Sequence, residues 1–412
     1  MKGGLAVDIQ KAQEIISSIF SSDDEVPVSA RIEFWEEGKG VSIGKGAPQF
    51  TIKFKDPKAL DALLVDPGLG FGEGYMEGSI EVEGDLDALL KLFYFYDLSN
   101  KLSVKQKAKI GWINIKQKLG QGLKQTKKDV QYHYDKGNEF YKLWLDKGLN
   151  YSCAFFKSEE DDLETAQLNK IHHILNKLRL KSGQKLLDIG CGWGSLVIEA
   201  AKKYGVLAVG LTLSKQQYEL ANKRIEEEGL NGRVEVRLED YRETSKKEGK
   251  SYDRVVSVGM FEHVGRENIP VFFKETKKLL KDKGIMVLHT IGRMQPEELD
   301  TWLKKYIFPG GYIPALGEVV EAADSYEFDF VDVEDFRIHY ARTLSHWIKR
   351  FEANENKIKE MMGEKFVRMW RLYLYGSRAS FSYGPMHVFQ FLYSLGRRYD
   401  WPLYRKWFYE NV

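Results

Sequence analysis

From about residue 129 onward, short apolar runs alternate with segments in which apolar residues recur every three or four positions. The apolar runs predict buried strands over 185–190, 206–212, 233–240, 252–260 and 285–292, and the segments between them predict helices. This alternation is typical of a doubly wound α/β fold with a largely parallel sheet. An apparent insertion (293–325), a helix near 343–362 and a long aromatic-rich stretch are expected to follow.

Residues 1–100 follow a different pattern, which predicts a small α+β N-terminal domain. Leu5 to Phe20 predicts a short amphipathic helix, and 30–35, 46–54 and 78–84 alternate like strands. The glycine-rich stretch 66–78 predicts a loop, and 85–98 predicts a helix that begins at Asp85. No catalytic pattern is visible in this part, so binding or scaffolding is its expected role.

Residues 101–128 contain nine Lys and no acidic residue. Apolar residues at helical spacing, including Trp112, form one face of the segment, so it predicts a basic amphipathic linker helix. Such a helix suits an anionic lipid surface. A solvated linker helix is the alternative, and nucleic acid is not expected because no base-reading module accompanies the charge. The remaining residues, 129–412, form the predicted catalytic domain.

The composition indicates in which cell compartment the protein is expected. The chain has 412 residues, and 62 Lys and Arg against 60 Asp and Glu give a net charge of +2, so any basic surface must be local. Two cysteines cannot form a disulfide framework and indicate a reducing compartment. No apolar run approaches the roughly 18 residues of a membrane span. We therefore expect a cytoplasmic protein, which does not exclude one that sits on a membrane surface.

The first predicted strand of the α/β part runs into a glycine-rich turn and then a helix. This turn reads Asp188-Ile-Gly190-Cys-Gly192-Trp-Gly194. Glycines at this place let the backbone turn tightly and approach a ligand. The spacing is not the dinucleotide pattern G-x-G-x-x-G, and no Lys-Ser/Thr follows as in a phosphate-binding P-loop. An ordinary glycine-rich turn is the alternative to a cofactor site.

Polar side chains also end the second and third strands. Thr212 and Gln217 stand where many nucleotide-binding folds place an acid that holds the ribose, and Asp240 stands where contacts to a base edge are expected. Each could equally cap a helix.

A second group of polar residues follows the later strands. Glu262 and His289 come at the ends of the fourth and fifth strands, so both should face the crevice where open α/β sheets bind ligands. Cys153, His339 and Tyr340 are further candidates. A lone His or Cys is usually structural. A zinc site from Cys153, Glu262 and His289 is conceivable, but no close-spaced ligand pair supports it, and no metal is expected.

Together these segments carry a resemblance. The glycine turn resembles the first motif, [D/E]-x-G-x-G-x-G, of class I S-adenosylmethionine-dependent methyltransferases. The segments HYDKGNEFY, YSCAFF, LLDIGCGWGSL, GLTLSKQQ, VGMFEHVG, LHTIG, KYIFPGGYIP and FRIHYARTL occur in order between about 130 and 345. They resemble the cyclopropane-fatty-acyl-phospholipid synthases and the related mycolic acid cyclopropane synthases. The resemblance implies a class I methyltransferase, Rossmann-like fold for this part of the chain.

The resemblance also implies a reaction. Such enzymes transfer a methylene group from S-adenosylmethionine to the cis double bond of an unsaturated phospholipid acyl chain. Attack by the alkene leaves a carbocation, and a bound bicarbonate ion takes a proton so that a cyclopropane ring closes. The bicarbonate site maps to Cys153, Glu262, His289, the backbone of Ile291, and Tyr340. The cofactor contacts map to Tyr134, Tyr151, Ser152, Asp188, Gly190, Gly192, Gly194, Thr212, Gln217 and Asp240.

The N-terminal domain favours a membrane phospholipid over a carrier-bound acyl chain, because the mycolic acid enzymes lack that domain. The resemblance further implies peripheral contact with the inner face of the cell membrane, and a homodimer. Three alternatives stay open. The carbocation could end in a methyl-branched or oxygenated chain, the substrate could be a small molecule, or the chain could be a non-catalytic lipid-binding module.

Overall fold

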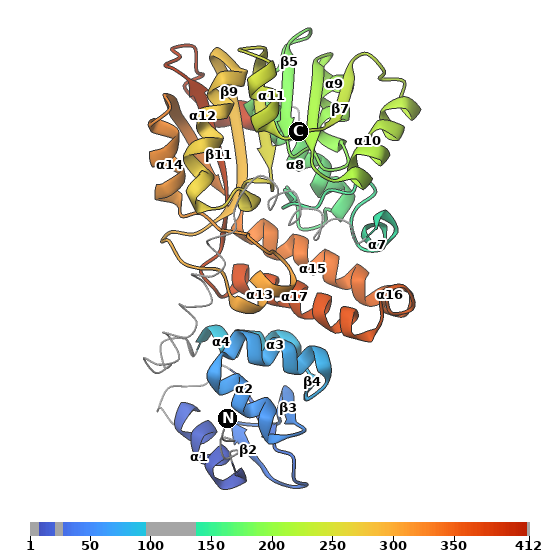
Figure 1. Ribbon diagram of the computed structural model, residues 1–412, viewed down its shortest axis with the longest axis vertical. Coiled ribbons are helices and arrows are strands. Elements are labelled where there is room, and N and C mark those ends of the chain that lie inside the picture. The colour runs from blue at the N-terminus through green and yellow to red at the C-terminus, as the bar shows by residue number, and fades with distance from the viewer. Residues whose placement is uncertain (1–7, 21–27, 96–136, 410–412) are drawn as a thin grey trace. The chain divides into compact units, whose positions relative to one another are not determined.

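The computed structural model of the chain describes residues 8–20, 28–95 and 137–409 (Figure 1). The predicted basic helix 101–128, Tyr134 and the first residues of the predicted helix from Leu5 lie outside the described residues. The chain divides into two compact units. One comprises residues 1–119, 300–309 and 351–384, and the other comprises 120–299, 310–350 and 385–412.

The larger unit contains a seven-stranded sheet in the order β10-β11-β9-β8-β5-β6-β7. Its strands are β5 (Lys185–Ile189), β6 (Leu207–Thr212), β7 (Val234–Leu238), β8 (Tyr252–Val258), β9 (Leu280–Gly292), β10 (Phe328–Asp335) and β11 (His387–Leu395). The strands from β5 to β9 pair in parallel, whereas β11 is antiparallel to both β9 and β10. The five strands predicted from the sequence are confirmed, although β9 begins at Leu280, five residues earlier than predicted.

Helices cover both faces of this sheet (Figure 1). They are α8 (Leu163–Lys177), α9 (Ser195–Tyr204), α10 (Lys215–Glu227), α11 (Tyr241–Lys247), α12 (Ile269–Leu279) and α14 (Leu316–Asp324). The unit also contains α7 (Asn138–Lys142) and α15 (Arg337–Ala353). Short 3-10 turns lie at Phe261–His263, Arg266–Asn268 and Arg405–Phe408. The prediction of a doubly wound α/β fold is confirmed.

Each face of the sheet buries its own apolar core, because successive side chains of a strand point to opposite faces. Leu187 and Ile189 of β5 pack with Phe272 of α12 on one face, whereas Leu186 packs with Val197 of α9 on the other. Strands buried on both faces read as continuous apolar runs, which is why the sequence pattern identified them.

The aromatic-rich stretch near the C-terminus supplies a strand that the sequence pattern did not mark. Strand β11 inserts between β9 and β10, and it is buried along almost its whole length. The predicted helix near 343–362 is also corrected. It begins earlier, as α15, and is interrupted at Asn354 before α16 (Glu355–Met362).

The smaller unit is an α+β structure, as predicted. Its strands β1 (Ala30–Glu33), β2 (Gly40–Ile43), β3 (Phe50–Phe54) and β4 (Ile80–Gly84) form a sheet in the order β2-β1-β3-β4. Its helices are α1 (Ile9–Phe20), α2 (Pro57–Val65), α3 (Pro67–Glu77), α4 (Leu86–Phe95), α13 (Thr301–Tyr306), α16 and α17 (Glu364–Ser382).

The loop predicted over 66–78 is wrong, because the segment forms helix α3. Asp66 caps its N-terminus by accepting from the backbone N–H of Leu69 at 3.1 Å, and Pro67 supplies the first helical residue. Its glycines allow close approach. A Cβ added at Gly70 would lie 2.4 Å from the backbone of Ala62 in α2, and one at Gly72 would lie 2.2 Å from the Trp302 ring. Composition indicated a loop, but close packing is what requires the glycines.

Segments far along the chain complete this unit, so its limits differ from the range 1–100 taken from the sequence. Thr301 donates to both carboxylate oxygens of Asp66 at 2.9 and 3.0 Å. Arg368 in α17 contacts the Glu81 carboxylate at 3.1 Å, and Arg378 contacts Asp87 at 2.7 Å. Contacts of this kind join sequence-distant segments and cannot be read from local pattern.

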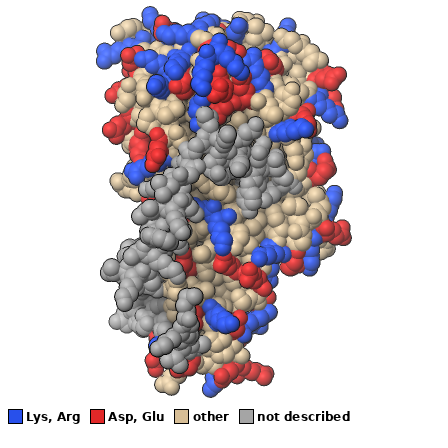
Figure 2. Space-filling model, viewed as in Figure 1, with Lys and Arg blue, Asp and Glu red and all other residues tan. Residues whose placement is uncertain are grey.

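Charged side chains of both signs are interspersed on the visible face (Figure 2), as the near-zero net charge of +2 implies. No helix in the described residues is long and apolar enough to cross a membrane.

The packing of α3 gives a test. We expect Gly70→Ala to lower the free energy of unfolding by about 1–3 kcal/mol, because the added Cβ overlaps the backbone of α2. Gly376→Ala in α17 is the matched control, since its Cβ meets no atom within 4 Å. That change should raise stability by about 0.5–1 kcal/mol through helix propensity. Denaturant unfolding measures both, and equal effects would contradict the packing role.

Candidate active site

A cavity opens at the carboxyl ends of β5, β6 and β8, beside the point where the strand order reverses. It encloses about 1140 Å³, its mouth included. Eight of the ten predicted cofactor residues line it, namely Tyr151, Ser152, Asp188, Gly190, Gly192, Thr212, Gln217 and Asp240. Gly194 does not line it, and Tyr134 is not among the described residues. The crevice at a strand reversal is where open α/β sheets bind ligands.

The glycine turn shapes one wall of the cavity. Gly190 and Gly192 both adopt positive φ, at 87° and 55°, which L side chains rarely accept. A Cβ at Gly190 would lie 2.4 Å from Met260, whereas one at Gly192 would meet no protein atom within 4 Å. Gly192 therefore leaves open space for a ligand, and Gly190 admits the neighbouring loop. Gly194 instead begins α9 and packs against Ala221.

The opposite wall, residues 148–152, is held by hydrogen bonds to its backbone. Ser195 and Arg224 both donate to the carbonyl of Gly148, and Arg224 also donates to the carbonyl of Trp193 at 2.8 Å. Gln167 in α8 donates to the carbonyl of Ser152 at 2.9 Å. These contacts fix the wall relative to the glycine turn.

A buried lysine in α8, which the sequence pattern did not mark, also lines the cavity. Lys170 is 2% exposed and donates to Ser152 Oγ at 2.7 Å. Burial lowers its pKa to about 8. No sequence signal marked Lys170, because a lysine in an amphipathic helix is normally solvated.

Asp188 lies at the floor of the cavity and is 2% exposed. Burial raises its pKa to about 7, and the positive charge of Lys170 opposes this shift. Among the described residues, Asp188 Oδ1 has no hydrogen-bond partner. An unpartnered buried carboxylate oxygen fits an amino group of a bound ligand.

The hydroxyl and amide at the end of β6 contact each other. Thr212 Oγ1 donates to Gln217 Oε1 at 2.7 Å, and Thr212 also accepts from the backbone N–H of Ser214 at 3.2 Å. Ser214 caps α10. The chemistry of these groups allows them to accept and donate toward a sugar hydroxyl.

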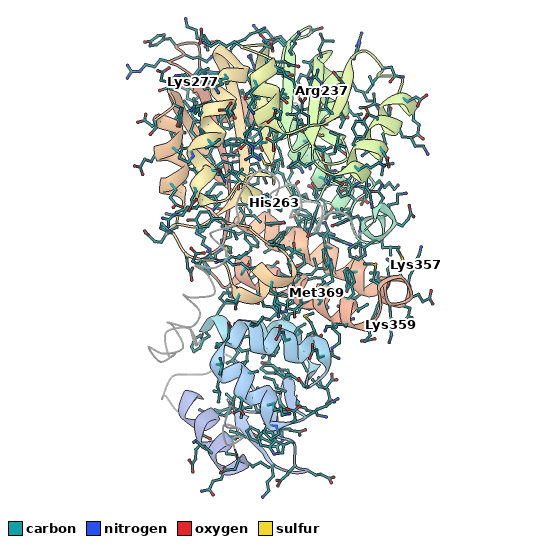
Figure 3. The ribbon with its side chains drawn as sticks, in the orientation of Figure 1. Arg237, His263, Lys277, Lys357, Lys359 and Met369 are labelled. Atoms are coloured by element: carbon teal, nitrogen blue, oxygen red, sulfur yellow. The ribbon has the colours of Figure 1, made fainter. Side chains whose placement is uncertain are left out.

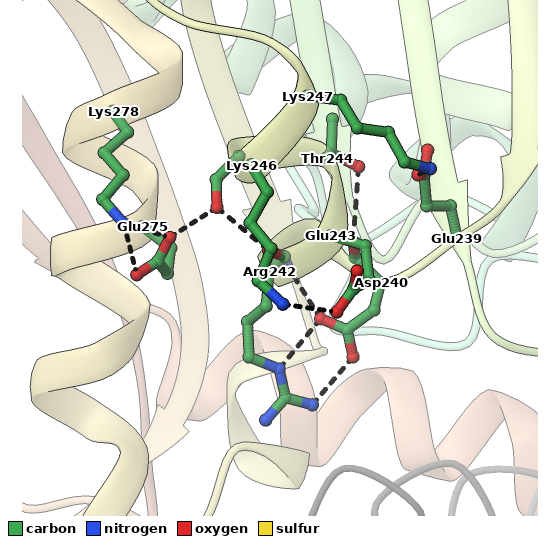
Figure 4. Close-up of polar contacts among 10 residues, drawn as sticks. Glu239, Asp240, Arg242, Glu243, Thr244, Lys246, Lys247, Glu275 and Lys278 are labelled. Atoms are coloured by element: carbon green, nitrogen blue, oxygen red, sulfur yellow. Dashed lines mark hydrogen bonds and ion pairs between the residues drawn. The ribbon is translucent and has the colours of Figure 1, made fainter.

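Asp240 is engaged by an arginine that the sequence did not single out. Its carboxylate caps α11 and forms a two-point contact with Arg242, at 2.9 Å to Nε and 2.7 Å to Nη2 (Figure 4). Arg242 lines the cavity as well. His263, labelled in Figure 3, is a further lining residue, and burial lowers its pKa to about 4, so it is neutral at pH 7.

The predicted bicarbonate residues do not line this cavity but adjoin it at the end of β9. Glu262 comes two residues after Met260 in the cavity wall, and its Oε1 accepts from the backbone N–H of Ile291 at 2.6 Å. The family resemblance implies that this N–H donates to the anion, whereas here it donates to the carboxylate of Glu262. Burial raises the pKa of Glu262 to about 6. Its Oε2 has no hydrogen-bond partner in the described part of the chain.

His289 lies beside the cavity wall on β9, where its carbonyl accepts from the backbone N–H of Gly259 at 2.9 Å. Gln390, directly opposite on β11, donates to His289 Nδ1 at 3.1 Å. Burial lowers the pKa of His289 well below its ordinary value, so the ring is neutral and carries its proton on Nε2. Within the described residues, this Nε2 has no partner. The sequence could not reveal Gln390, because only the insertion of β11 brings it here.

Cys153 and Tyr340 lie on neighbouring segments. Cys153 is 1% exposed, its Sγ donates to the carbonyl of Phe336 at 3.7 Å, and burial raises the pKa of its thiol. The ring of Phe336 lies 5.8 Å from that of His289. Tyr340, 7% exposed, follows one turn later in α15. The thiol is protonated at neutral pH, so Cys153 does not act as a thiolate.

The fold and the cavity define a class I S-adenosylmethionine-dependent methyltransferase. Three features define this class: the acid and glycine turn after the first strand, the polar groups after the second and third strands, and an antiparallel strand inserted at one side of the sheet. The residues present fit the cofactor. Asp188 suits its ammonium group, Thr212 and Gln217 suit its ribose, and Gly192 leaves room for its chain.

Residues 121–391 match the family model described as mycolic acid cyclopropane synthetase, and the chain belongs to this family. It is therefore an enzyme of the cyclopropane synthase type. Residues 11–106 match a separate domain model of unknown function, DUF7884. The resemblance read from the sequence is confirmed.

Relatives of known name match over most of the chain. The cyclopropane-fatty-acyl-phospholipid synthase of Escherichia coli K12 is 36% identical over 87% of this chain and 91% of its own. A probable fatty acid methyltransferase of Pseudomonas putida is 34% identical over 88% and 91%.

Solved structures match the larger part of the chain. The cyclopropane synthase MmaA2 from Mycobacterium tuberculosis superposes with a TM-score of 0.62 at 34% identity, covering 65% of this chain and 98% of that one. The mycolic acid cyclopropane synthase CmaA1, solved with S-adenosylhomocysteine and CTAB, gives 0.61 at 34% identity, with coverage of 65% and 98%.

The raised pKa of Asp188 predicts a pH effect on stability in the cofactor-free protein. The folded state holds the Asp188 proton up to about pH 7, whereas the unfolded chain releases it near pH 4. Stability contributed by this proton is therefore present at low pH and lost as pH rises toward 7. We expect Asp188→Asn to gain stability relative to the wild type as pH rises from about 4 to about 7, measured by urea unfolding. A stability difference that does not change with pH would contradict the buried protonated state.

Proposed function

We propose that the protein transfers a methylene group from S-adenosylmethionine to the cis double bond of an unsaturated phospholipid acyl chain, with bicarbonate as the base. The observation that carries this proposal is that two buried atoms beside the cofactor cavity, His289 Nε2 and Glu262 Oε2, each lack a hydrogen-bond partner among the described residues. A neutral imidazole N–H donates and a carboxylate oxygen accepts. Bicarbonate offers both a charged oxygen and a hydroxyl, so it matches the two together.

The residues of the cofactor cavity would bind and orient the methyl donor, whereas His289 and Glu262 would act on the proton that is removed later. S-adenosylmethionine, when bound, would supply the methyl group. Asp188, Thr212 and Gln217 would orient it, so that its sulfonium methyl faces the alkene and alignment lowers the barrier. The buried ring of Trp144 and the partly buried ring of Tyr151, which it contacts, would exclude water that would otherwise trap the carbocation as an alcohol. Their ring faces also favour positive charge.

The second part of the site handles the proton. Bicarbonate, when bound, would supply the base that removes a proton from the new methyl group. His289 Nε2–H would donate to it, held in that tautomer by Gln390. Glu262, fixed by the Ile291 N–H, would accept a hydrogen bond from the hydroxyl group of the ion. A carboxylate and an anion side by side would repel each other without that proton, so Glu262 acts as an acceptor and not as the base. Tyr340 and Cys153 would complete the site.

The extent of the matches supports a phospholipid substrate. The Escherichia coli relative that is named for phospholipid covers 87% of this chain, N-terminal unit included, whereas cyclopropane mycolic acid synthase 1 of Mycobacterium tuberculosis covers only 64%. The N-terminal unit and the Lys-rich segment 101–128 would position the enzyme on the inner face of the cell membrane.

A homodimer is also part of the proposal. Light scattering that gives the mass of one chain would contradict it.

The second candidate is an acyl-chain methyltransferase that leaves a branched or oxygenated product. The Pseudomonas putida relative, named a probable fatty acid methyltransferase, favours it. Both candidates share the fold and the cofactor and differ only in the fate of the carbocation.

Mass spectrometry of lipids tests the proposal. Purified protein is incubated with S-adenosylmethionine, bicarbonate and vesicles of cis-unsaturated phospholipid. We expect each modified acyl chain to gain the mass of one CH₂. Its fragmentation pattern should show that the double bond is no longer present. A gain of one CH₂ with the double bond retained would favour the second candidate. Bound cofactor without any gain would favour the lipid-binding module.

Variants of the second part of the site sharpen this test. We expect Glu262→Ala and His289→Ala each to lower turnover by about 10²–10⁴-fold, the usual contribution of proton transfer. Affinity for S-adenosylhomocysteine, measured by calorimetry, should stay largely unchanged, because neither residue lines the cofactor cavity. If both measurements fall together, these residues belong to the cofactor site instead.

Binding to lipid vesicles tests the membrane part. We expect stronger binding to vesicles that contain anionic lipid, and weaker binding as salt rises from 0.1 M to 1 M, where the screening length falls from about 10 Å to about 3 Å. Co-sedimentation measures the bound fraction, and vesicles of zwitterionic lipid are the control. Binding that salt leaves unchanged would contradict an electrostatic contact.

A further inference from the structure

One stripe of helix α15 holds the chain segment that joins the two parts of the site. His339, Thr343 and Trp347 recur every four residues and so lie on one face of the helix. All three contact residues 151–156. This segment carries Tyr151 and Ser152 on the cofactor side, and Cys153 on the bicarbonate side.

Two members of the stripe accept backbone hydrogen bonds from the segment. The N–H of Ala154 donates to Thr343 Oγ1 at 3.0 Å, and Thr343 donates in turn to the carbonyl of His339 at 2.7 Å. The N–H of Phe156 donates to His339 Nδ1 at 3.2 Å. Burial lowers the pKa of His339, which keeps Nδ1 available as an acceptor. Thr343 is fully buried, so water cannot replace it.

The third member contacts both parts of the site through its ring. The Trp347 ring centroid lies 5.3 Å from that of Tyr151 and 5.8 Å from that of Tyr340. Trp144 packs edge-on against it at 5.5 Å. Trp347 is fully buried and lines no part of the cavity, so it acts on the reaction only through its neighbours.

The position of this segment would set the distance between a bound methyl donor and the proton acceptor. Ser152 is held from α8 by Gln167 and Lys170, whereas Ala154 is held from α15 by Thr343. A shift of residues 153–156 along α15 would move Cys153 relative to His289, whereas Ser152 would stay held from α8. Differences of about 1 Å in such placement change rates strongly.

We propose that His339, Thr343 and Trp347 are positioning residues that couple methyl transfer to ring closure. The inference rests on the proposed function and assigns these residues no direct contact with substrate. These residues hold the proton acceptor close to the new methyl group, so that the carbocation loses a proton there before it reacts in any other way.

The fates of the carbocation make this coupling measurable. Loss of a proton from the new methyl group, with closure of the C–C bond, gives the cyclopropane. Loss of a proton from a neighbouring chain carbon gives a methylated alkene of the same mass. Addition of water with loss of a proton gives a methylated alcohol. A residue needed only for folding would lower all three products together, whereas a positioning residue changes their ratio.

The test compares Thr343→Val with Thr343→Ser. The valine variant keeps the shape but removes the acceptor of the Ala154 N–H, whereas the serine variant keeps the acceptor. We expect the ratio of cyclopropane to the other methylated products to fall about tenfold in Thr343→Val, the change that about 1.4 kcal/mol gives. The ratio should return toward the wild-type value in Thr343→Ser. Fragmentation of product lipids measures the ratio, and affinity for S-adenosylhomocysteine should stay unchanged in both variants.

Thr276→Val is the matched control. Thr276 is buried in α12, and its hydroxyl has no hydrogen-bond partner among the described residues. This change should leave the product ratio at the wild-type value.

Trp347→Phe and Trp347→Leu give a second measurement if Thr343→Val does not fold. The phenylalanine variant keeps a ring between Tyr151 and Tyr340 and should retain more ring closure than the leucine variant. Unchanged ratios in every folded variant would overturn the inference while the proposed function stands. Absence of any methylated lipid from the wild-type protein would overturn the proposed function, and the inference with it.

Discussion

The reversal of strand order beside β5 is the constraint on which the rest of the site depends. β5 pairs with β6 on one side and β8 on the other, so the connections that follow these strands diverge to opposite faces of the sheet. The divergence leaves a crevice at their carboxyl ends, lined by the glycine turn, by Thr212 and by Gly259. Because the strands are buried on both faces, this end is where the backbone can leave the core and present polar groups to a ligand.

Burial then sets the protonation states that the chemistry needs. The crevice holds Asp188 and Lys170 with pKa values shifted toward 7 and 8, and the adjoining group holds a neutral His289 and a Glu262 whose pKa is about 6. In water, Asp188, Lys170 and Glu262 would be firmly ionised at pH 7, whereas a histidine would be partly protonated. Unpartnered oxygens and nitrogens in such a place cost free energy in the empty protein, and a ligand with matching groups recovers it. The same burial keeps out the water that would divert a carbocation.

Two secondary-structure elements fix these groups in place. The antiparallel strand β11 brings Gln390 against His289, and helix α15 brings Thr343 against the segment that carries Cys153. Both elements come late in the chain, after the methyltransferase-like alternation of strand and helix. In the smaller unit, later segments likewise complete the structure, as Thr301 on Asp66 and Arg368 on Glu81 illustrate.

The sequence by itself determined the parallel strands, the glycine turn and most of the residues around the cofactor cavity. Such features are local, because a buried strand reads as an apolar run and a tight turn demands glycine. Tertiary structure alone decided that the glycines of 66–78 pack a helix, that Lys170 is buried beside Asp188, and that the Ile291 N–H binds Glu262. It alone decided the partner of His289 as well. Each depends on a neighbour distant in sequence, and the energy of a close contact or a buried charge is set by that neighbour, not by the local pattern of residues.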